Sequence, residues 1–203
     1  MLRGLTAHML LTRTYPVGPG AVLLVHAAAG GLGGLLTRWA KRLGATVIGT
    51  VGSEIKAAQA RAHGADHLIV GRDANVPAAV AELTAGRGVD FAIDGIGGDL
   101  LAKTLACVRK FGTVASIGQA AGPIPPVTVE SLGPVRSLTL ARPSVMAYAA
   151  EPDTYRASAA VILDVIRAGI AADIGGNYPL AEAARAQADL EAGRTAGSLL
   201  LIP

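Results

Sequence analysis

A run of small residues stands between an apolar segment and a helical pattern near the start of the sequence. Residues 21–25 are apolar at every position, His26 follows, and the run AAAGGLG occupies positions 27–33. Beyond this run, Leu35, Trp39 and Leu43 recur every four residues, a spacing typical of one face of a helix. The sequence therefore predicts a buried strand, a tight turn and a helix in immediate succession.

The turn fits the pattern Ala-x-x-Gly-x-x-Gly, a variant of the fingerprint of dinucleotide-binding domains. Ala27 permits a tight exit from the strand, Gly30 lets backbone amides approach a diphosphate, and Gly33 lets the helix pack closely on the sheet. The positive end of the helix then faces the diphosphate. A merely flexible loop is the alternative interpretation, but the flanking strand and helix favour a phosphate-binding turn.

Short apolar segments alternate with helical patterns through most of the chain. Strands apolar on both faces, alternating with helices, predict an α/β fold of the Rossmann type: a parallel six-stranded sheet with helices on both faces. The predicted strands are residues 21–25, 46–51, 67–70, 89–96, 113–117 and 137–142. The predicted helices between them are residues 31–43, 53–63, 76–84 and 99–110, and a glycine- and proline-rich loop spans residues 118–133.

Neither end of the chain follows this alternation of strands and helices. Residues 1–14 predict a connecting helix with no strand before it, and residues 15–150 the nucleotide-binding domain. Residues 151–203 form a tail with predicted helices at 152–168 and 180–192 and a strand at 198–202. These tail elements need not belong to the nucleotide-binding sheet.

The end of the second strand bears on which dinucleotide binds. NAD-binding domains usually place an acidic residue there to hold the ribose hydroxyls, but this sequence has Val51 followed by Gly52 and Ser53. Lys56 lies one helical turn on and offers a positive charge, which favours the extra 2′-phosphate of NADPH. Glu54 is expected to point to solvent. The alternative is that Lys56 is an ordinary surface lysine.

Composition excludes several other classes of protein. A single cysteine, Cys107, permits no internal disulfide, is expected in the core, and suits a reducing compartment such as the cytoplasm. The four histidines have no metal-ligand spacing, so we expect no metal site. A net charge of +3 without a basic run gives no support for nucleic-acid binding. The apolar stretch of residues 21–36 is cut by His26 and four glycines, which argues against a membrane span.

The sequence resembles a family, the zinc-free quinone oxidoreductases of the zeta-crystallin type, within the medium-chain dehydrogenase/reductase superfamily. The resemblance runs from end to end and is far more specific than the glycines alone. The segments that carry it are GLTA at 4–7, HAAAGGLG at 26–33, WAK at 39–41, IGTVG at 48–52, residues 94–97, SIG at 116–118, RPS at 142–144, YPL at 178–180 and GSLLLIP at 197–203.

The resemblance implies a two-domain enzyme that passes hydride from NADPH to a quinone or another conjugated enone. It implies a homodimer through the edge strand from Ser137 to Arg142, and a substrate-binding barrel domain that precedes Met1 and carries most of the substrate-holding groups. It also implies that the tail of residues 151–203 returns toward this catalytic domain. We name no catalytic residue. The cofactor-binding residues that it implies, together with those read from the turn, are Thr6, Ala27, Gly30, Gly31, Leu32, Gly33, Gly52, Ser53, Lys56, Arg72, Gly95, Ile96, Ile117 and Gly118.

Three positions depart from the family pattern. Gly71 stands where a tyrosine often helps to hold the 2′-phosphate, and Arg72 is the candidate to replace it. Gln187 replaces a histidine of the final helix, and Gly193 replaces a serine before Arg194. Two other functions stay open: an enoyl reductase domain of a polyketide or fatty acid synthase, and an NADPH-binding module without catalysis.

Overall fold

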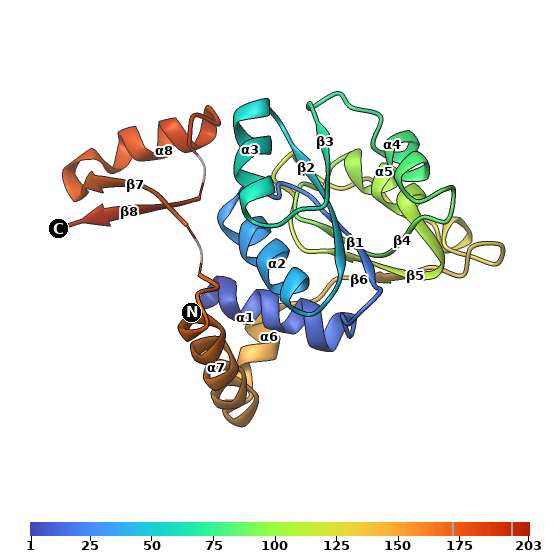
Figure 1. Ribbon diagram of the computed structural model, residues 1–203, viewed down its shortest axis with the longest axis horizontal. Helices are drawn as coiled ribbons and strands as arrows, with labels where there is room; N and C mark the ends of the chain where they lie inside the picture. Colours follow the sequence, from blue (N-terminus) through green and yellow to red (C-terminus); the bar gives the residue numbers. More distant parts are fainter. Residues whose placement is uncertain (172, 196) are drawn as a thin grey trace.

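The chain forms an α/β fold of the Rossmann type, seen in a computed structural model that describes residues 1–171, 173–195 and 197–203 (Figure 1). Its main sheet has six parallel strands in the order β3-β2-β1-β4-β5-β6. The predicted fold class is therefore confirmed. The strands are β1 (Val22–Val25), β2 (Thr46–Val51), β3 (His67–Val70), β4 (Val89–Asp94), β5 (Val108–Ser116) and β6 (Thr139–Ala141).

Helices cover both faces of this sheet because alternate residues of each strand point to opposite sides. Leu23 and Val25 of β1 join the core under α1 (Leu2–His8), α2 (Gly31–Arg42) and α3 (Glu54–Ala62). Leu24, between them, joins the second core under α4 (Val76–Leu83) and α5 (Leu100–Cys107). The apolar run of β1 thus serves two layers.

Capping residues set several of the helix ends. Gly44, with a φ of +83°, follows α2 and takes the left-handed conformation that closes a helix. The Ser53 hydroxyl accepts from the backbone N–H of Lys56 (3.5 Å) and caps α3. Asn75 caps α4 in the same way, through the backbone N–H of Ala78 (3.3 Å).

The predicted helix over residues 99–110 is wrong at its end. Helix α5 stops at Cys107, and Val108 already pairs with Val89 as the first residue of β5. Arg109 therefore does not lie in a last helical turn; its Nε donates to the carboxylate of Asp90 on the neighbouring strand (2.5 Å). A cross-strand ion pair has overridden the helical pattern.

The head of the chain packs into the core. It forms α1 and a π-helix, η1 (Met9–Thr14), and buries Leu5, Leu10 and Leu11 against the sheet. Helix α7 (Pro152–Arg167) contacts α1 and adds Ile162 to the same core. The division of the chain at residues 14 and 150 stays a prediction.

The sequence patterns do not predict two elements, α6 (Val145–Ala150), which precedes the tail, and β7 (Ile174–Pro179), which lies within it. Strand β7 pairs in parallel with β8 (Ser198–Ile202), and α8 (Ala183–Glu191) connects them. Two glycines, an asparagine and a terminal proline hide β7 from sequence patterns because these residues are rare in strands. Short 3-10 turns, η2 (Val129–Ser131) and η3 (Leu180–Glu182), complete the chain. In Figure 1 the β7–α8–β8 unit stands beside α3, apart from the sheet.

Among the residues that the structure describes, no helix is both long and apolar enough to span a membrane.

Candidate functional site

The sheet order reverses between β1 and β4, and the predicted site segments follow the carboxyl ends of five strands. In a sheet of this order, ligands bind in the crevice outside those ends, at the point of reversal. The structure brings to this edge the turn of residues 27–33 after β1, residues 52–56 after β2, Arg72 after β3, residues 95–96 after β4 and residues 117–118 after β5.

The turn after β1 is compact. Ala27 has a φ of +52°, and its carbonyl accepts from the backbone N–H of Gly30 (2.8 Å). The N–H of Ala28 donates to the carbonyl of Thr50 at the end of β2 (3.0 Å). A Cβ added to Gly33 would lie 2.2 Å from the carbonyl oxygen of Ala27, so the turn leaves no room for a side chain at this position. The helix-on-sheet packing assigned to Gly33 stays a prediction.

Helix α2 begins directly at this turn, and its N-cap residue is Gly30, which has no side chain to cap it. The positive end of the helix macrodipole therefore lies at the crevice without a capping oxygen from that residue. This arrangement suits an anion such as a diphosphate. Gly31 and Leu32 form the first turn of α2 and lie partly exposed there.

Two cations lie together at the ends of β2 and β3. The Arg72 side chain runs beside Gly52, 3.7 Å from the position of a Cβ on that residue. A Cβ built on Gly193, in the tail, would lie 3.3 Å from Nη2 of Arg72 and 3.6 Å from Nζ of Lys56. Lys56 and Arg72 thus flank one region, whereas Glu54 is exposed, as predicted.

A buried polar network shapes the loop after β4. Asp94 accepts from the backbone N–H groups of Ile96 (2.8 Å) and Gly97 (2.9 Å) and from the hydroxyl of Thr104 (3.1 Å). His26 bridges Thr104 (2.9 Å) and Thr50 (3.0 Å). Burial lowers the pKa of His26 although the charge of Asp94 opposes this effect, so the ring is neutral at pH 7.

The same loop touches the end of β5. The N–H of Ile117 donates to the carbonyl of Asp94 (2.8 Å), and a Cβ on Gly118 would lie 2.5 Å from the carbonyl oxygen of Gly95. Thr6 is on α1, and its hydroxyl donates to the carbonyl of Leu2 (3.0 Å). No described contact joins Thr6 to the crevice, so its role stays a prediction.

The tail also reaches the turn after β1, which the sequence analysis did not foresee. Gly197 forms an isolated parallel bridge with Gly30. The side chain of Arg3 donates to the hydroxyl of Ser198, and both lie against Gly31. Gly197 and Ser198 lie more than 160 positions beyond the residues of α1 and of the turn that they contact, so no local pattern links them.

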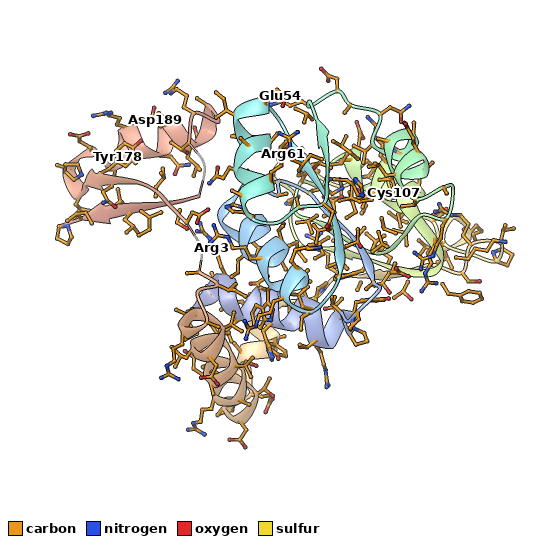
Figure 2. The ribbon with its side chains drawn as sticks, in the orientation of Figure 1. Arg3, Glu54, Arg61, Cys107, Tyr178 and Asp189 are labelled. Atoms are coloured by element: carbon orange, nitrogen blue, oxygen red, sulfur yellow. The ribbon has the colours of Figure 1, made fainter. Side chains whose placement is uncertain are left out.

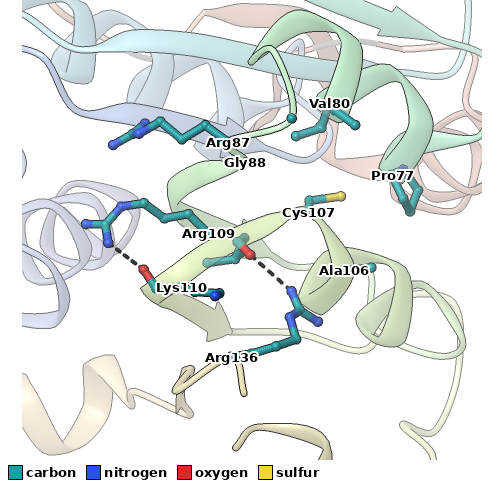
Figure 3. Close-up of a pocket in the computed structure, with 12 residues that line it drawn as sticks. Pro77, Val80, Arg87, Gly88, Ala106, Cys107, Arg109, Lys110 and Arg136 are labelled. Atoms are coloured by element: carbon teal, nitrogen blue, oxygen red, sulfur yellow. Dashed lines mark hydrogen bonds between the residues drawn. The ribbon is translucent and has the colours of Figure 1, made fainter. Parts of the chain in front are cut away.

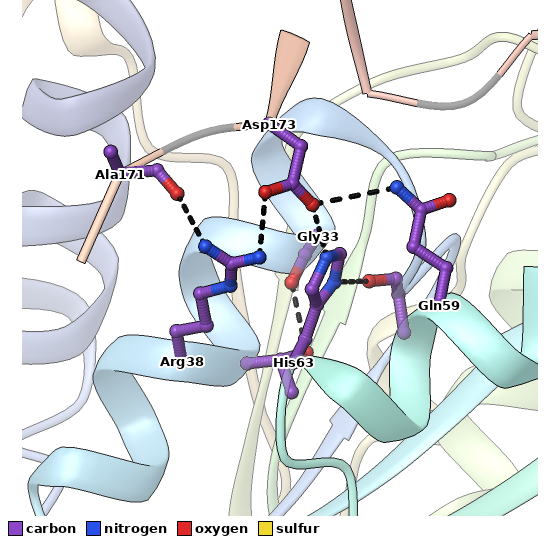
Figure 4. A network of polar contacts seen from close by, with 8 residues as sticks. Gly33, Arg38, Gln59, His63, Ala171 and Asp173 are labelled. Atoms are coloured by element: carbon purple, nitrogen blue, oxygen red, sulfur yellow. Dashed lines mark hydrogen bonds and ion pairs between the residues drawn. The ribbon is translucent and has the colours of Figure 1, made fainter. Parts of the chain in front are cut away.

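A cluster around Asp173 ties the tail to the Rossmann helices (Figure 4). The carboxylate of Asp173 accepts from Arg38 (2.6 Å) on α2, from Gln59 (3.4 Å) on α3, and from the ring of His63 just beyond α3. Its backbone carbonyl accepts from the N–H of Ser198 (2.7 Å). Burial alone would raise the pKa of Asp173, but the His63 hydrogen bond and the Arg38 charge lower it.

Two surface pockets lie at opposite edges of the sheet. One, of about 530 Å³, opens at the amino ends of β4 and β5 and is lined by Cys107, Lys110 and three arginines (Figure 3). Two of these arginines bind Asp90, and Arg136 donates to two backbone carbonyls. The other, of about 420 Å³, lies at the carboxyl end of β5, where Arg142 donates to Ser116 (2.9 Å). Only the second lies at the edge of the crevice.

The described residues contain no group of three or more His, Cys, Asp or Glu side chains placed to hold a metal ion.

Comparison with known proteins places the chain among dehydrogenases. The family described as zinc-binding dehydrogenase matches residues 31–163. A quinone oxidoreductase of Pseudomonas aeruginosa is 42% identical over 204 residues, covering all of this chain and 63% of the relative. A 2-haloacrylate reductase of a Burkholderia species is 40% identical over 205 residues, covering all of this chain and 62% of the relative. This chain therefore spans less than two thirds of their length.

Solved structures agree. A mycobacterial protein whose structure was determined in complex with NADPH superimposes with a TM-score of 0.95 at 41% identity, covering all of this chain and 64% of that one. A reducing polyketide synthase of Metacordyceps chlamydosporia matches only 116 residues, 56% of this chain, at 36% identity. The chain belongs to the zinc-binding dehydrogenase family, and it corresponds to the nucleotide-binding part of the quinone oxidoreductases among the medium-chain dehydrogenases and reductases.

Proposed function

We propose that this chain binds NADPH and is the nucleotide-binding part of an oxidoreductase that reduces quinones or related conjugated enones. The observation that carries the proposal is the presence of two anion-attracting features at the carboxyl ends of neighbouring strands. An uncapped helix N-terminus stands after β1, and Lys56 and Arg72 stand together after β2 and β3. Relatives that match the whole chain are named quinone oxidoreductase and 2-haloacrylate reductase.

The residues present fit a dinucleotide with a 2′-phosphate. Gly30, Gly31 and Gly33 keep the turn free of side chains, because a Cβ on Gly30 or Gly33 would meet the Ala27 carbonyl and one on Gly31 would meet Arg3. Their backbone amides and that of Leu32 can then face the diphosphate. Lys56 and Arg72 supply charge for the 2′-phosphate, with the Gly52 backbone and the Ser53 hydroxyl beside them. Arg72 thereby replaces the tyrosine that family members often have at the position of Gly71.

NADPH supplies the hydride, and the residues of this chain hold and orient the cofactor. The loop at Gly95 and Ile96, fixed by Asp94, lines the ribose and nicotinamide end together with Ile117 and Gly118. The neutral ring of His26 supports that loop indirectly, because it bonds the hydroxyl of Thr104, which donates to Asp94. Polarising the acceptor carbonyl falls to a separate substrate-binding domain, since this chain spans 62–64% of its relatives.

The remaining parts of the proposal concern assembly and setting. Strand β6 is the terminal strand of the sheet, so its outer edge suits pairing of Thr139–Ala141, within residues 137–142, with the same strand of a second copy. A homodimer is the proposed assembly, and the cytoplasm the proposed location. Zinc independence belongs to the same proposal, and acceptor reduction that survives a strong chelator would support it.

Among the alternatives, the synthase enoyl reductase receives less support, because the synthase match covers little more than half of the chain. The quinone oxidoreductase match covers all of it.

Titration of the chain with NADPH and with NADH tests the cofactor. We expect tighter binding of NADPH, because a charge-assisted contact to the 2′-phosphate contributes about 1.5–3 kcal/mol, roughly 10- to 150-fold in affinity. Lys56→Ala should reduce the difference in affinity between NADPH and NADH. Lys110→Ala, at the opposite edge of the sheet, should leave that difference unchanged. Equal affinities of the unaltered chain for both dinucleotides would refute the proposal.

A further inference from the structure

We propose that Arg3 is a cofactor-binding residue that supplies a positive charge to the diphosphate at the turn after β1, and that Ser198 positions it there. This inference rests on the proposed function. It adds to the predicted site a side chain from α1, at the head of the chain, and one from β8, at its end.

The position of Arg3 is the first observation. Its side chain leaves α1 and lies against Gly31, the first residue of α2 (Figure 2). The nearest atoms to a Cβ built on Gly31 are Nη1 and Cζ of the Arg3 guanidinium, followed by the Ser198 hydroxyl oxygen at 3.1 Å. The guanidinium thus stands at the point where the diphosphate approaches the helix N-terminus.

The charge of Arg3 is the second observation. Among the described residues nine ion pairs form, and none of them includes Arg3. A cation beside the positive end of a helix macrodipole is unfavourable unless an anion lies between them. A diphosphate is an anion of the right kind, because the planar guanidinium donates two parallel hydrogen bonds to phosphate oxygens.

Ser198 is held in place independently of Arg3. Its backbone N–H donates to the carbonyl of Asp173 (2.7 Å), and its neighbour Gly197 bridges to Gly30. The Ser198 hydroxyl accepts from Nη1 of Arg3, which leaves the other N–H groups of the guanidinium for a ligand. The tail therefore orients Arg3 without consuming its donors.

The first test compares Arg3→Gln with Arg13→Gln, which removes an exposed arginine from the same helical stretch. Each chain is titrated with NADPH and with adenosine 2′-monophosphate, which lacks the diphosphate. We expect Arg3→Gln to weaken NADPH binding about tenfold, which is the lower end of the effect of a charge-assisted contact. The affinity for adenosine 2′-monophosphate should stay unchanged. Arg13→Gln should change neither.

If Arg3→Gln binds NADPH as tightly as the unaltered chain or more tightly, the proposed role of Arg3 is overturned, but the proposed function is not. Tighter binding would mean that the Arg3 side chain blocks the turn. Equal losses for both ligands would also overturn it, because the effect would not be specific to the diphosphate. Failure of the unaltered chain to bind NADPH would instead overturn the proposed function, and this inference with it.

The second test addresses Ser198 through a double-mutant cycle. Ser198→Ala should weaken NADPH binding in the unaltered chain and have no further effect in the Arg3→Gln background, because its contribution passes through Arg3. Additive losses would show that Ser198 acts on its own and would overturn its positioning role. Thermal unfolding of each variant reports whether the fold is intact.

Discussion

At the scale of single residues, burial determines the reactivity of Cys107, the one cysteine of the sequence. Cys107 is buried beneath the end of α5, and its thiol donates to the carbonyl of Lys103 (3.1 Å). Burial raises the pKa of Cys107 to about 12, although the charge of Arg136 works in the opposite direction. The thiolate, which is the nucleophilic form, is therefore scarce at neutral pH.

We predict that Cys107 reacts slowly with a thiol reagent in the folded chain at pH 8 and fully in denaturant, which an absorbance assay with an aromatic disulfide reagent measures. The contrast follows because unfolding removes the desolvation that raises the pKa. Equal rates in both states would show that the thiol is accessible, contrary to its burial.

At the scale of secondary-structure elements, one carboxylate on β4 makes contacts with both neighbouring strands, β1 and β5. Asp90 accepts from the backbone N–H of Val22 on β1 (2.8 Å) and pairs with Arg87 and Arg109. Burial would raise the pKa of Asp90, but the hydrogen bonds from Arg109, Val22 and Arg87 lower it. These contacts also explain why the chain after Cys107 continues as a strand where its pattern is helical.

We predict that Asp90→Asn lowers the free energy of unfolding by about 1–3 kcal/mol at pH 7, because a buried charge partner of two arginines is lost. Denaturant unfolding measures this change. Asp153→Asn, which affects only an exposed pair on α7, is the matched control and should change stability little. A loss as large for Asp153→Asn as for Asp90→Asn would contradict the argument.

At the scale of the whole molecule, the Asp173 cluster joins the β7–α8–β8 unit to the nucleotide-binding sheet. Arg38, Gln59 and His63 all converge on that one carboxylate, and Ser198 bonds to its backbone. The same tail segment carries Gly197, which forms a bridge with Gly30 in the turn after β1. The position of the tail and the shape of the turn are therefore coupled.

We predict that Asp173→Asn increases hydrogen exchange at the amides of β8 and weakens NADPH binding, whereas Asp164→Asn, in an exposed pair on α7, does neither. In the unaltered chain the pKa of Asp173 is lowered from its ordinary 3.8. Its stabilising effect is then complete above that ordinary value and is lost as pH falls through the lower folded pKa. Unchanged exchange at β8 in Asp173→Asn would show that other contacts hold the tail.

The sequence alone was sufficient for the order and type of the central elements. Period-four spacing, apolar runs and capping residues such as Ser53 act over a few neighbours, so they identify β1, α2 and α3 without a structure. The turn from Ala27 to Gly33 belongs to this class, because its glycines are required by local backbone approach.

Tertiary structure decided the rest, because those features depend on contacts between distant residues. The end of α5 is set by Arg109 and Asp90, on neighbouring strands. Strand β7 exists because β8 pairs with it. Arg3 reaches Ser198 across nearly the whole chain, and the entropy of closing so long a loop is repaid only when the sheet, α1 and the tail pack together.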